Sequence, residues 1–237
     1  MTATSPSGKL LQAKRKRGLE PLLLEGRKTA LPRLDAAKRL FDILFSLSVL
    51  ILFSPIYLVL ALLIAVSSPG PIFYLQERVG RNYKRFGCIK FRTMIVNADE
   101  VLRQMMETDQ ALRQEFADNF KLKHDPRITW IGRFLRVTSL DEFPQFWNVL
   151  KGDMSVVGPR PLVPDELYMY GDRMDKVLTI KPGITGLWQV SGRNDIPYER
   201  RVKIDVYYVN NRNFWLDLWI IIKTLGVVFF PNNNGAY

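Results

Sequence analysis

The longest apolar stretch of the chain runs from Ile43 to Val66 and contains no side chain that is charged at neutral pH. As a helix it would be about 36 Å long, which exceeds the roughly 30 Å thickness of the hydrocarbon core of a bilayer. Ser54 and Pro55 lie near its middle, and a proline in that position removes a helical hydrogen bond and bends the helix. The pattern predicts a membrane segment with a sharp bend at Ser54-Pro55.

Basic residues flank this segment on both sides. Lys38 and Arg39 precede it. The cluster that follows it comprises Arg78, Arg81, Lys84 and Arg85. Because cationic residues favour the cytoplasmic side of a membrane, both ends are expected on the same side. A hairpin that enters one leaflet and returns at Pro55 meets this condition. The length fits a single span equally well, and a buried helix of a soluble protein is the third alternative.

Three shorter patterns predict further elements. Residues 72–75 favour a short strand or an aromatic contact with the membrane surface. Apolar residues over 98–120 recur at three-and-four spacing, which predicts one long amphipathic helix or two shorter ones, with the apolar face in the core. The apolar run over 214–230 is interrupted by Asp217 and Lys223. It is too short to span a membrane and predicts an interfacial or core-packed helix.

Charge and composition limit the classes of function that the chain could have. The chain has 34 basic and 23 acidic residues, a net charge of +11, and its first 37 residues form a basic and polar segment. This balance indicates an anionic partner: nucleic acid, acidic lipid or a phosphorylated substrate. Cys88 and His124 are the only residues of their types. Their scarcity excludes disulfide and zinc scaffolds and leaves carboxylates and lysines as the main candidates for chemistry.

Candidate chemistry lies after the membrane segment, where cations cluster over residues 90–93, 136–145 and 158–161. Cations beside two carboxylates indicate phosphate chemistry, because phosphoryl oxygens need neutralising while a carboxylate serves as nucleophile or metal ligand. The two carboxylates are Asp141 and Glu142. Adjacent carboxylates repel each other, and one remedy is Mg²⁺, which takes oxygen ligands and shares them with substrate phosphates.

The same two acids have a purely structural interpretation. The sequence from Ser139 to Glu142 matches a capping box, with Ser139 as the N-cap of a helix. Pro144 would then fall inside that helix and remove a hydrogen bond, whereas a helix starting at Phe143 would have its proline at the favoured first position. A helix N-terminus also favours bound phosphate, so a cap and a catalytic site can coincide.

Motifs over residues 38–230 resemble those of the monotopic phosphoglycosyl transferases, a bacterial sugar transferase family that loads a polyprenyl phosphate carrier. The matching motifs are KRLFD at 38–42, SP at 54–55, ERVG at 77–80, KFRTM at 90–94, LR at 135–136, TSLDE at 138–142, VGPRP at 157–161, PGITG at 182–186 and QVSGRN at 189–194. The resemblance depends on the number and order of these motifs, since no one of them is decisive.

The resemblance implies a two-step exchange. Asp141 would attack the β-phosphorus of a UDP-sugar and expel UMP, which leaves the sugar phosphate on the carboxylate as an acyl phosphate. Undecaprenyl phosphate would then attack to give a polyprenyl-diphospho-sugar. By the same comparison Glu142 helps to hold Mg²⁺ on the diphosphate, so Mg²⁺ is the expected cofactor.

Contacts to the substrate phosphates are expected mainly from cations in these motifs. The predicted substrate-binding residues are Lys90, Arg92, Arg136, Arg160, Gln189 and Arg193. For the cations, a solvated basic face is the alternative.

The family also has a hairpin that dips into one leaflet, so the resemblance favours the re-entrant interpretation of Ser54-Pro55. We expect a mainly helical α+β fold. Its parts would be a basic, disordered tail (1–37), a re-entrant membrane helix (38–67), a catalytic domain with amphipathic helices and a few short strands (68–230), and a C-terminal tail (231–237). The catalytic domain would lie at headgroup depth on the cytoplasmic face of the inner membrane.

The expected partners are a UDP-hexose, undecaprenyl phosphate and anionic lipids, with a homodimer as a further option and no nucleic acid. The chain resembles the short members of the family, which consist of the core alone. Residues 99–123 resemble members that act in exopolysaccharide or O-antigen assembly and commonly transfer galactose or glucose phosphate. Two rival hypotheses follow from the charge and the apolar segment: a membrane-tethered nucleic-acid-binding protein and a non-enzymatic membrane scaffold.

Overall fold

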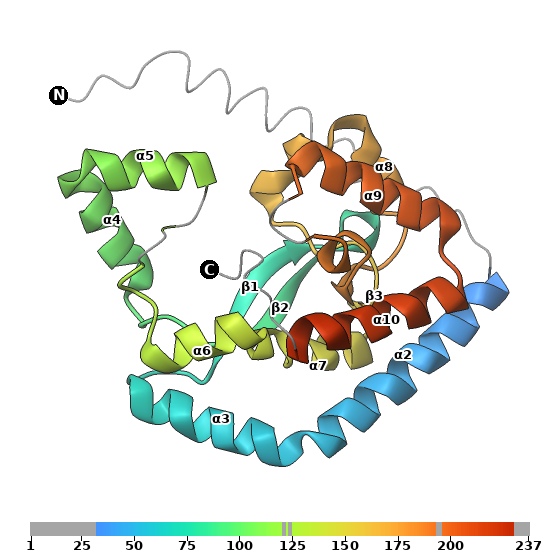
Figure 1. Cartoon of the computed structure of the whole chain (residues 1–237), viewed down its shortest axis with the longest axis horizontal. Helices are drawn as coiled ribbons and strands as arrows, with labels where there is room; N and C mark the ends of the chain where they lie inside the picture. Colours follow the sequence, from blue (N-terminus) through green and yellow to red (C-terminus); the bar gives the residue numbers. More distant parts are fainter. Residues whose placement is uncertain (1–31, 120–121, 123–124, 193–195, 230–237) are drawn as a thin grey trace.

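The computed structural model of the chain describes residues 32–119, 122, 125–192 and 196–229 (Figure 1). Its α-helices are α2 Pro32–Leu52, α3 Ser54–Ser67, α4 Ala98–Thr108, α5 Gln110–Asn119, α6 Trp130–Thr138, α7 Gln145–Lys151, α8 Met174–Val177, α9 Tyr198–Asn211 and α10 Phe214–Phe229. Its 3₁₀ helices are η1 Arg81–Tyr83, η2 Leu140–Glu142, η3 Pro164–Arg173 and η4 Trp188–Val190. Its strands are β1 Phe73–Val79, β2 Arg85–Phe91, β3 Ser155–Val157 and β4 Gly183–Thr185. The described part is mainly helical with short strands, as the α+β prediction requires.

Helices α2 and α3 form a bent apolar pair along one edge of the molecule (Figure 1). The bend between them is 62°. Pro55 lies in the first turn of α3, where its missing N–H removes no helical hydrogen bond. The predicted break at Ser54-Pro55 is confirmed. Within the described ranges no helix alone is long and apolar enough to cross a bilayer, whereas α2 and α3 together have the required length and composition.

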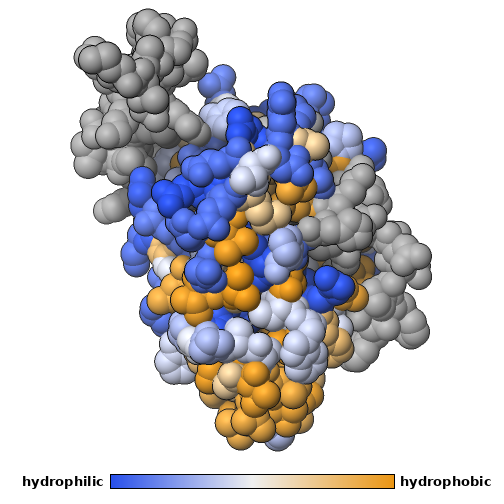
Figure 2. All heavy atoms as spheres, turned by 90° about the vertical axis from the view of Figure 1, so that its left-hand side faces the viewer, coloured by the Kyte–Doolittle hydropathy of each residue, from blue (hydrophilic) through white to orange (hydrophobic). Residues whose placement is uncertain are grey.

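The start of α2 differs from the expected boundary. The helix begins at Pro32, so residues 32–37, which were assigned to the basic tail, belong to α2. The rest of that tail and the C-terminal tail lie outside the described residues. The outer side of the pair exposes large apolar side chains, including Leu44, Ile51, Leu52, Leu58, Leu62 and Val66. Figure 2 shows hydrophobic side chains gathered at one end of the molecule.

Two small sheets follow the helix pair. Strands β1 and β2 pair antiparallel, with Phe73 opposite Phe91, so the strand expected near residues 72–75 is confirmed. Strands β3 and β4 pair parallel, with Val157 opposite Thr185. The carboxyl ends of both β3 and β4 therefore point to the same edge of their sheet.

The amphipathic stretch over 98–120 forms two helices, α4 and α5, rather than one. Figure 1 shows them meeting at an angle on its left-hand side, away from the strands. Helix α4 has no fully buried residue, so the expectation that its apolar face lies in the core is wrong. Its half-buried Val101, Leu102 and Met105 lie on the apolar side that the spacing predicted.

One side of α10 packs in the core and its other side is exposed, so the helix combines the two alternatives expected for residues 214–230. Ile220 is 0% exposed and Ile221 is 8% exposed, while Trp215 and Trp219 are 74% and 44% exposed. The buried side joins the main hydrophobic core with α7, β2 and β3. The other side presents tryptophans to the surroundings.

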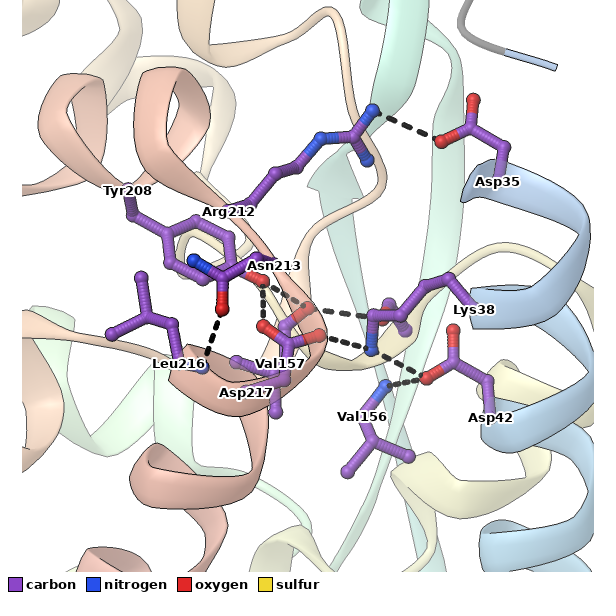
Figure 3. A network of polar contacts seen from close by, with 11 residues as sticks. Asp35, Lys38, Asp42, Val156, Val157, Tyr208, Arg212, Asn213, Leu216 and Asp217 are labelled. Atoms are coloured by element: carbon purple, nitrogen blue, oxygen red, sulfur yellow. Dashed lines mark hydrogen bonds and ion pairs between the residues drawn. The ribbon is translucent and has the colours of Figure 1, made fainter. Parts of the chain in front are cut away.

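A polar network joins α2 to the rest of the fold (Figure 3). Lys38 Nζ lies 2.8 Å from Asp42 Oδ1 and 3.1 Å from Asp217 Oδ2. The backbone N–H of Val156 donates to Asp42 Oδ1 over 3.1 Å, and the Tyr208 hydroxyl donates to Asp217 Oδ1 over 2.7 Å. These bonds fix the apolar helix pair relative to α9, α10 and β3.

Candidate active site

The adjacent acids Asp141 and Glu142 lie in η2, a single turn that connects α6 to α7. Ser139 ends α6 with a left-handed φ of 59° and makes no N-cap hydrogen bond to η2. Pro144 is the N-cap of α7. The capping-box interpretation is therefore wrong, and the proline ends up just before a helix that starts at Gln145. The acids occupy a connecting turn whose position is set by the two helices it joins.

Glu142 is held among cations. Lys90 Nζ, from β2, lies 2.8 Å from Glu142 Oε1, and the two side chains are 16% and 28% exposed. Burial by itself would raise the pKa of Glu142, but Lys90 and Arg160 together lower it to about 2. Glu142 is consequently ionised throughout the neutral range.

The pKa of Asp141 is shifted in the opposite direction. Burial and then the charge of Glu142 raise the pKa of Asp141 to about 6, against the opposing effects of Lys90 and Arg136. Arg136, at the end of α6, is oriented by a 3.0 Å hydrogen bond from its Nε to Thr93 Oγ1. Neighbouring acids whose pKa values are pushed apart are typical of sites where each acid has its own task.

A small cavity adjoins Glu142 and has several polar walls. The polar side chains that line it are Arg78, Lys90, Glu142, Gln145, Arg160 and Gln189. The fold therefore brings three predicted substrate-binding residues, Lys90, Arg160 and Gln189, together with one of the predicted acids. Arg136 lies instead beside Asp141.

Strands β3 and β4 explain how Arg160 and Gln189 meet. Each residue follows the carboxyl end of one of these parallel strands, and such ends lie at one edge of a sheet. The two backbones approach closely at Gly158 and Gly183. A Cβ on Gly158 would lie 2.6 Å from the Lys181 carbonyl oxygen, and one on Gly183 would lie 2.1 Å from the Gly158 nitrogen. The glycines of the two motifs permit this approach.

Two predicted residues lie elsewhere. The guanidinium of Arg92 donates to the carbonyl oxygens of Ser68 and Pro69 over 2.6 and 2.9 Å, at the end of α3, and it does not line the cavity. In this position the arginine stabilises the chain segment that leaves the apolar helix pair, and its role in substrate binding stays a prediction. Arg193 lies outside the described residues.

Sequence reasoning missed two residues that line the cavity, Arg78 and Gln145. Arg78 was noted as a flanking cation and as part of the ERVG motif, which was the available signal. Gln145 directly follows the Asp-Glu-Phe-Pro sequence and is 2% exposed. Nothing in the sequence pattern distinguished it from a surface glutamine.

The acids fit a magnesium ion that is shared with a substrate. Among the described residues no group of three or more carboxylate, histidine or cysteine side chains surrounds a common point. Magnesium does not need such a group, because it binds through one or two carboxylates together with phosphate oxygens and water. Glu142, ionised and beside the cavity, is the carboxylate whose oxygen such a shared ion would take.

The helix break lies against the residue that follows the acids. The rings of Phe53 and Phe143 meet edge to face with centroids 5.8 Å apart. Phe53 is the residue between α2 and α3. The bend in the apolar pair and the carboxylate turn are therefore neighbours in space.

Fixed cations around two unlike acids define a site for phosphorylated substrates. Comparison with known proteins agrees with that class. The family model described as "Bacterial sugar transferase" matches residues 33–231, and the chain belongs to that family.

Three relatives illustrate the similarity. The chain is 50% identical over 200 residues to the UDP-galactose-lipid carrier transferase of Erwinia amylovora, and the match covers 84% of this chain and 41% of that protein. It is 52% identical over 200 residues to the undecaprenyl-phosphate galactose phosphotransferase of Salmonella typhimurium, with the same coverages of 84% and 41%. It is 46% identical over 201 residues to the exopolysaccharide production protein ExoY of Rhizobium meliloti, covering 85% of this chain and 88% of ExoY. The chain thus spans about two fifths of the first two proteins and most of the third.

Proposed function

We propose that the chain transfers a hexose-1-phosphate from a UDP-sugar to undecaprenyl phosphate and releases UMP. The observation that supports this most directly is the placement of two adjacent acids among fixed cations: Lys90 Nζ lies 2.8 Å from Glu142 Oε1 in the cavity that Arg160 also lines, while Arg136 acts on Asp141. One acid can act as a nucleophile while the other stays ionised beside bound phosphate. Family membership and the names of the relatives point to the same activity.

In the first step an ionised oxygen of Asp141 attacks the β-phosphorus of the UDP-sugar. A bond forms between phosphorus and the carboxylate oxygen, and the bond from the β-phosphorus to the bridging oxygen breaks. UMP leaves with the bridging oxygen, and the sugar phosphate remains as an acyl phosphate. Lys90 and Arg136 act on Asp141 electrostatically and offset the negative charge that would repel an anionic nucleophile.

In the second step an oxygen of undecaprenyl phosphate attacks the same phosphorus. The bond between phosphorus and the Asp141 oxygen breaks, so the carboxylate is regenerated and the polyprenyl-diphospho-sugar is released. Dividing the exchange in this way lets the two phosphorylated substrates use one site in turn.

Mg²⁺ is the proposed cofactor, with Glu142 as its protein ligand. When bound, the ion would neutralise charge on the diphosphate. Lys90 Nζ lies 2.8 Å from the same carboxylate, and with the ion held there the lysine would be available to a phosphoryl oxygen.

The apolar pair α2–α3 is proposed to enter one leaflet and return, which places the site at the cytoplasmic surface of the inner membrane. The 62° bend supports a re-entrant path. Exposed aromatic and aliphatic side chains on neighbouring helices support interfacial contact. They include Trp130 and Phe134 on α6 and Trp215 and Trp219 on α10. Basic residues near the surface would add attraction to anionic lipids, about 1 kcal/mol each.

Galactose is the first sugar to test. The names of the E. amylovora and S. typhimurium proteins contain galactose, while a Klebsiella pneumoniae relative that is 41% identical is named as a glucose-1-phosphate transferase. The name of the R. meliloti relative refers to exopolysaccharide production. We infer that the product begins an exopolysaccharide or O-antigen repeat unit.

The test measures UMP release by the purified chain in nanodiscs, with Mg²⁺, undecaprenyl phosphate and either UDP-galactose or UDP-glucose. We expect turnover that requires both the lipid and Mg²⁺. Asp141→Asn should lower it by about a thousandfold or more, while Asp172→Asn, at an exposed aspartate of η3, should not. Mass spectrometry of the protein quenched during turnover should find the sugar phosphate on Asp141. Undiminished turnover in Asp141→Asn would remove the proposed nucleophile.

The rival functions and the topology have their own measurements. Salt-sensitive DNA binding that persists without residues 1–31 would favour the nucleic-acid hypothesis, and absence of any turnover would favour the scaffold. For the topology, Cys88→Ser supplies a cysteine-free background. Single cysteines at residue 14 and at Lys84, whose side chain is 76% exposed, should react from the same side of the membrane. Labelling from opposite sides would contradict the hairpin.

A further inference from the structure

Arg78 is a buried arginine in the wall of the cavity beside Glu142. It lies on β1 opposite Phe86 of β2 and is only 5% exposed. Arginine is seldom buried to this degree unless it is paired. The groups that contact the guanidinium of Arg78 therefore indicate its role.

The partners of Arg78 are uncharged. Its Nη1 donates to the Pro161 carbonyl oxygen over 2.9 Å and its Nη2 donates to Gln76 Oε1 over 2.6 Å. Its Nε is buried and has no hydrogen-bond partner among the described residues. No described carboxylate forms an ion pair with it. The charge of Arg78 is thus buried without an acid of its own.

The bond to Pro161 also constrains the neighbouring residue, Arg160. The next residue of β1, Val79, donates its N–H to the Leu162 carbonyl oxygen over 2.8 Å. The end of β1 is therefore bonded at two successive positions to the segment that directly follows Arg160. These bonds hold the backbone from which Arg160 reaches the cavity wall.

The cavity wall has an excess of positive charge. Arg78, Lys90 and Arg160 line it together with a single described carboxylate, Glu142. Burial and then the charge of Arg160 lower the pKa of Arg78, which shows that the two arginines repel each other. Uncompensated buried charge is costly, and an anionic ligand in the cavity would relieve both the repulsion and the excess.

We propose that Arg78 is a positioning residue of the donor-phosphate site: it holds Arg160 at the cavity through the Pro161 carbonyl and supplies the third cation that makes the site selective for a phosphoryl group. This inference rests on the proposed function for the identity of the donor.

Arg39 provides a matched control. It lies on α2, and like Arg78 its guanidinium donates to backbone carbonyl oxygens, here those of Val149 and Leu150. It does not line the cavity. Loss of either arginine removes a guanidinium that is bonded to backbone carbonyls, but only Arg78 lies in the cavity wall.

The experiment compares Arg78→Gln, Arg78→Lys and Arg39→Gln with the wild-type chain. UDP binding is measured by titration calorimetry with Mg²⁺, and kcat and KM for UDP-galactose are measured in nanodiscs. We expect Arg78→Gln to weaken UDP binding and raise KM by about tenfold or more, and Arg78→Lys, which keeps the charge but not the fork, to lie between it and the wild type. Arg39→Gln should lower the unfolding temperature but leave UDP affinity and KM unchanged.

A double variant tests the link to Arg160. If both arginines act on one anion, Arg78→Gln should weaken UDP binding much less in an Arg160→Gln background than in the wild type. Equal UDP affinity in Arg78→Gln and wild type would overturn the inference. It would also be overturned if Arg78→Gln weakened UDP binding by the same factor in the Arg160→Gln background as in the wild type. If Arg78→Gln does not fold, unchanged affinity in Arg78→Lys overturns it instead. UDP binding without any turnover of UDP-sugars would contradict the proposed function. The effect of Arg78→Gln on UDP affinity would still test the arginine site in that case.

Discussion

The hydroxyl of Tyr57 donates a 2.8 Å hydrogen bond to the carbonyl oxygen of Phe143. Tyr57 lies on α3, in the second half of the bent apolar pair, and Phe143 follows Glu142 directly. The bent helix pair and the carboxylate turn are therefore joined by one bond and the aromatic contacts around it. If the pair enters the membrane as proposed, this contact would set the height of Asp141 relative to the membrane surface.

Removing that bond should affect transfer to lipid. Tyr57→Phe leaves the Phe143 carbonyl without its partner, which should lower the free energy of unfolding by ~1 kcal/mol. We expect turnover with undecaprenyl phosphate in nanodiscs to fall by several-fold, and turnover with a short-chain, water-soluble polyprenyl phosphate to fall less. Tyr74→Phe, at a tyrosine of β1 that is 54% exposed, is the control. Equal losses with both acceptors would argue against the coupling.

The pH dependence should report Asp141. Because burial and Glu142 raise the pKa of this acid to about 6, its nucleophilic, ionised form is lost as the pH falls through 6. We expect kcat/KM for the UDP-sugar to be level above about pH 7 and to fall tenfold per pH unit below 6. Glu142, with its pKa lowered to about 2, does not titrate in this range. An acid limb centred near pH 4 would mean that Asp141 has an ordinary pKa.

Asp205 should make stability depend on pH. It is 0% exposed on α9 and accepts a 2.9 Å hydrogen bond from the Tyr170 hydroxyl. Burial raises its pKa to about 7, against the opposing effects of Tyr170 and Arg160, whereas an unfolded carboxyl has a pKa of about 3.9. The folded chain retains a proton that the unfolded chain releases. Its stabilising contribution is thus complete below about pH 4 and is lost as the pH rises through 7.

The variant that tests this is Asp205→Asn, which stays neutral at every pH. Thermal unfolding in detergent should show that its advantage over the wild type is larger at pH 8 than at pH 5. Asp172→Asn should show no such trend, since that aspartate is exposed. A constant offset between Asp205→Asn and wild type at both pH values would contradict a raised pKa.

Lys38 should be essential for the stability of the joint between α2 and α10. It pairs with Asp42 and Asp217, whose side chains are 3% and 6% exposed. Lys38→Met leaves two buried carboxylates without a cation, which should cost about 3–5 kcal/mol of unfolding free energy. The double variant Lys38→Met/Asp217→Asn should recover part of this loss. Lys203→Met, at an exposed pair with Glu199, should leave the unfolding temperature unchanged.

Local sequence was sufficient for the apolar pair and for the acids. The uncharged run and Pro55 predict the bend, since a missing N–H and a ring clash act within one helical turn. The motif around Asp141 and Glu142 identified the acids as candidates, and the cations at Lys90 and Arg160 were predicted from their motifs. Each of these inferences depends on neighbours in the chain or on a motif of a few residues.

The sequence by itself thus determined the bend of the helix pair, the candidate acids and the family to which the chain belongs. Only the tertiary structure decided which arginines face the carboxylates. Arg78, in β1, and Arg92, just after β2, are both buried arginines, yet one lines the cavity and the other binds the end of α3. The difference arises because the fold brings a different segment to each arginine: Pro161 to Arg78, and Ser68 with Pro69 to Arg92. Both segments are remote from their arginine in the chain, so the sequence around the arginine does not indicate which segment it contacts. The pKa values of Asp141 and Glu142 were likewise set by burial and by charges brought from β2, α6 and the β3 loop.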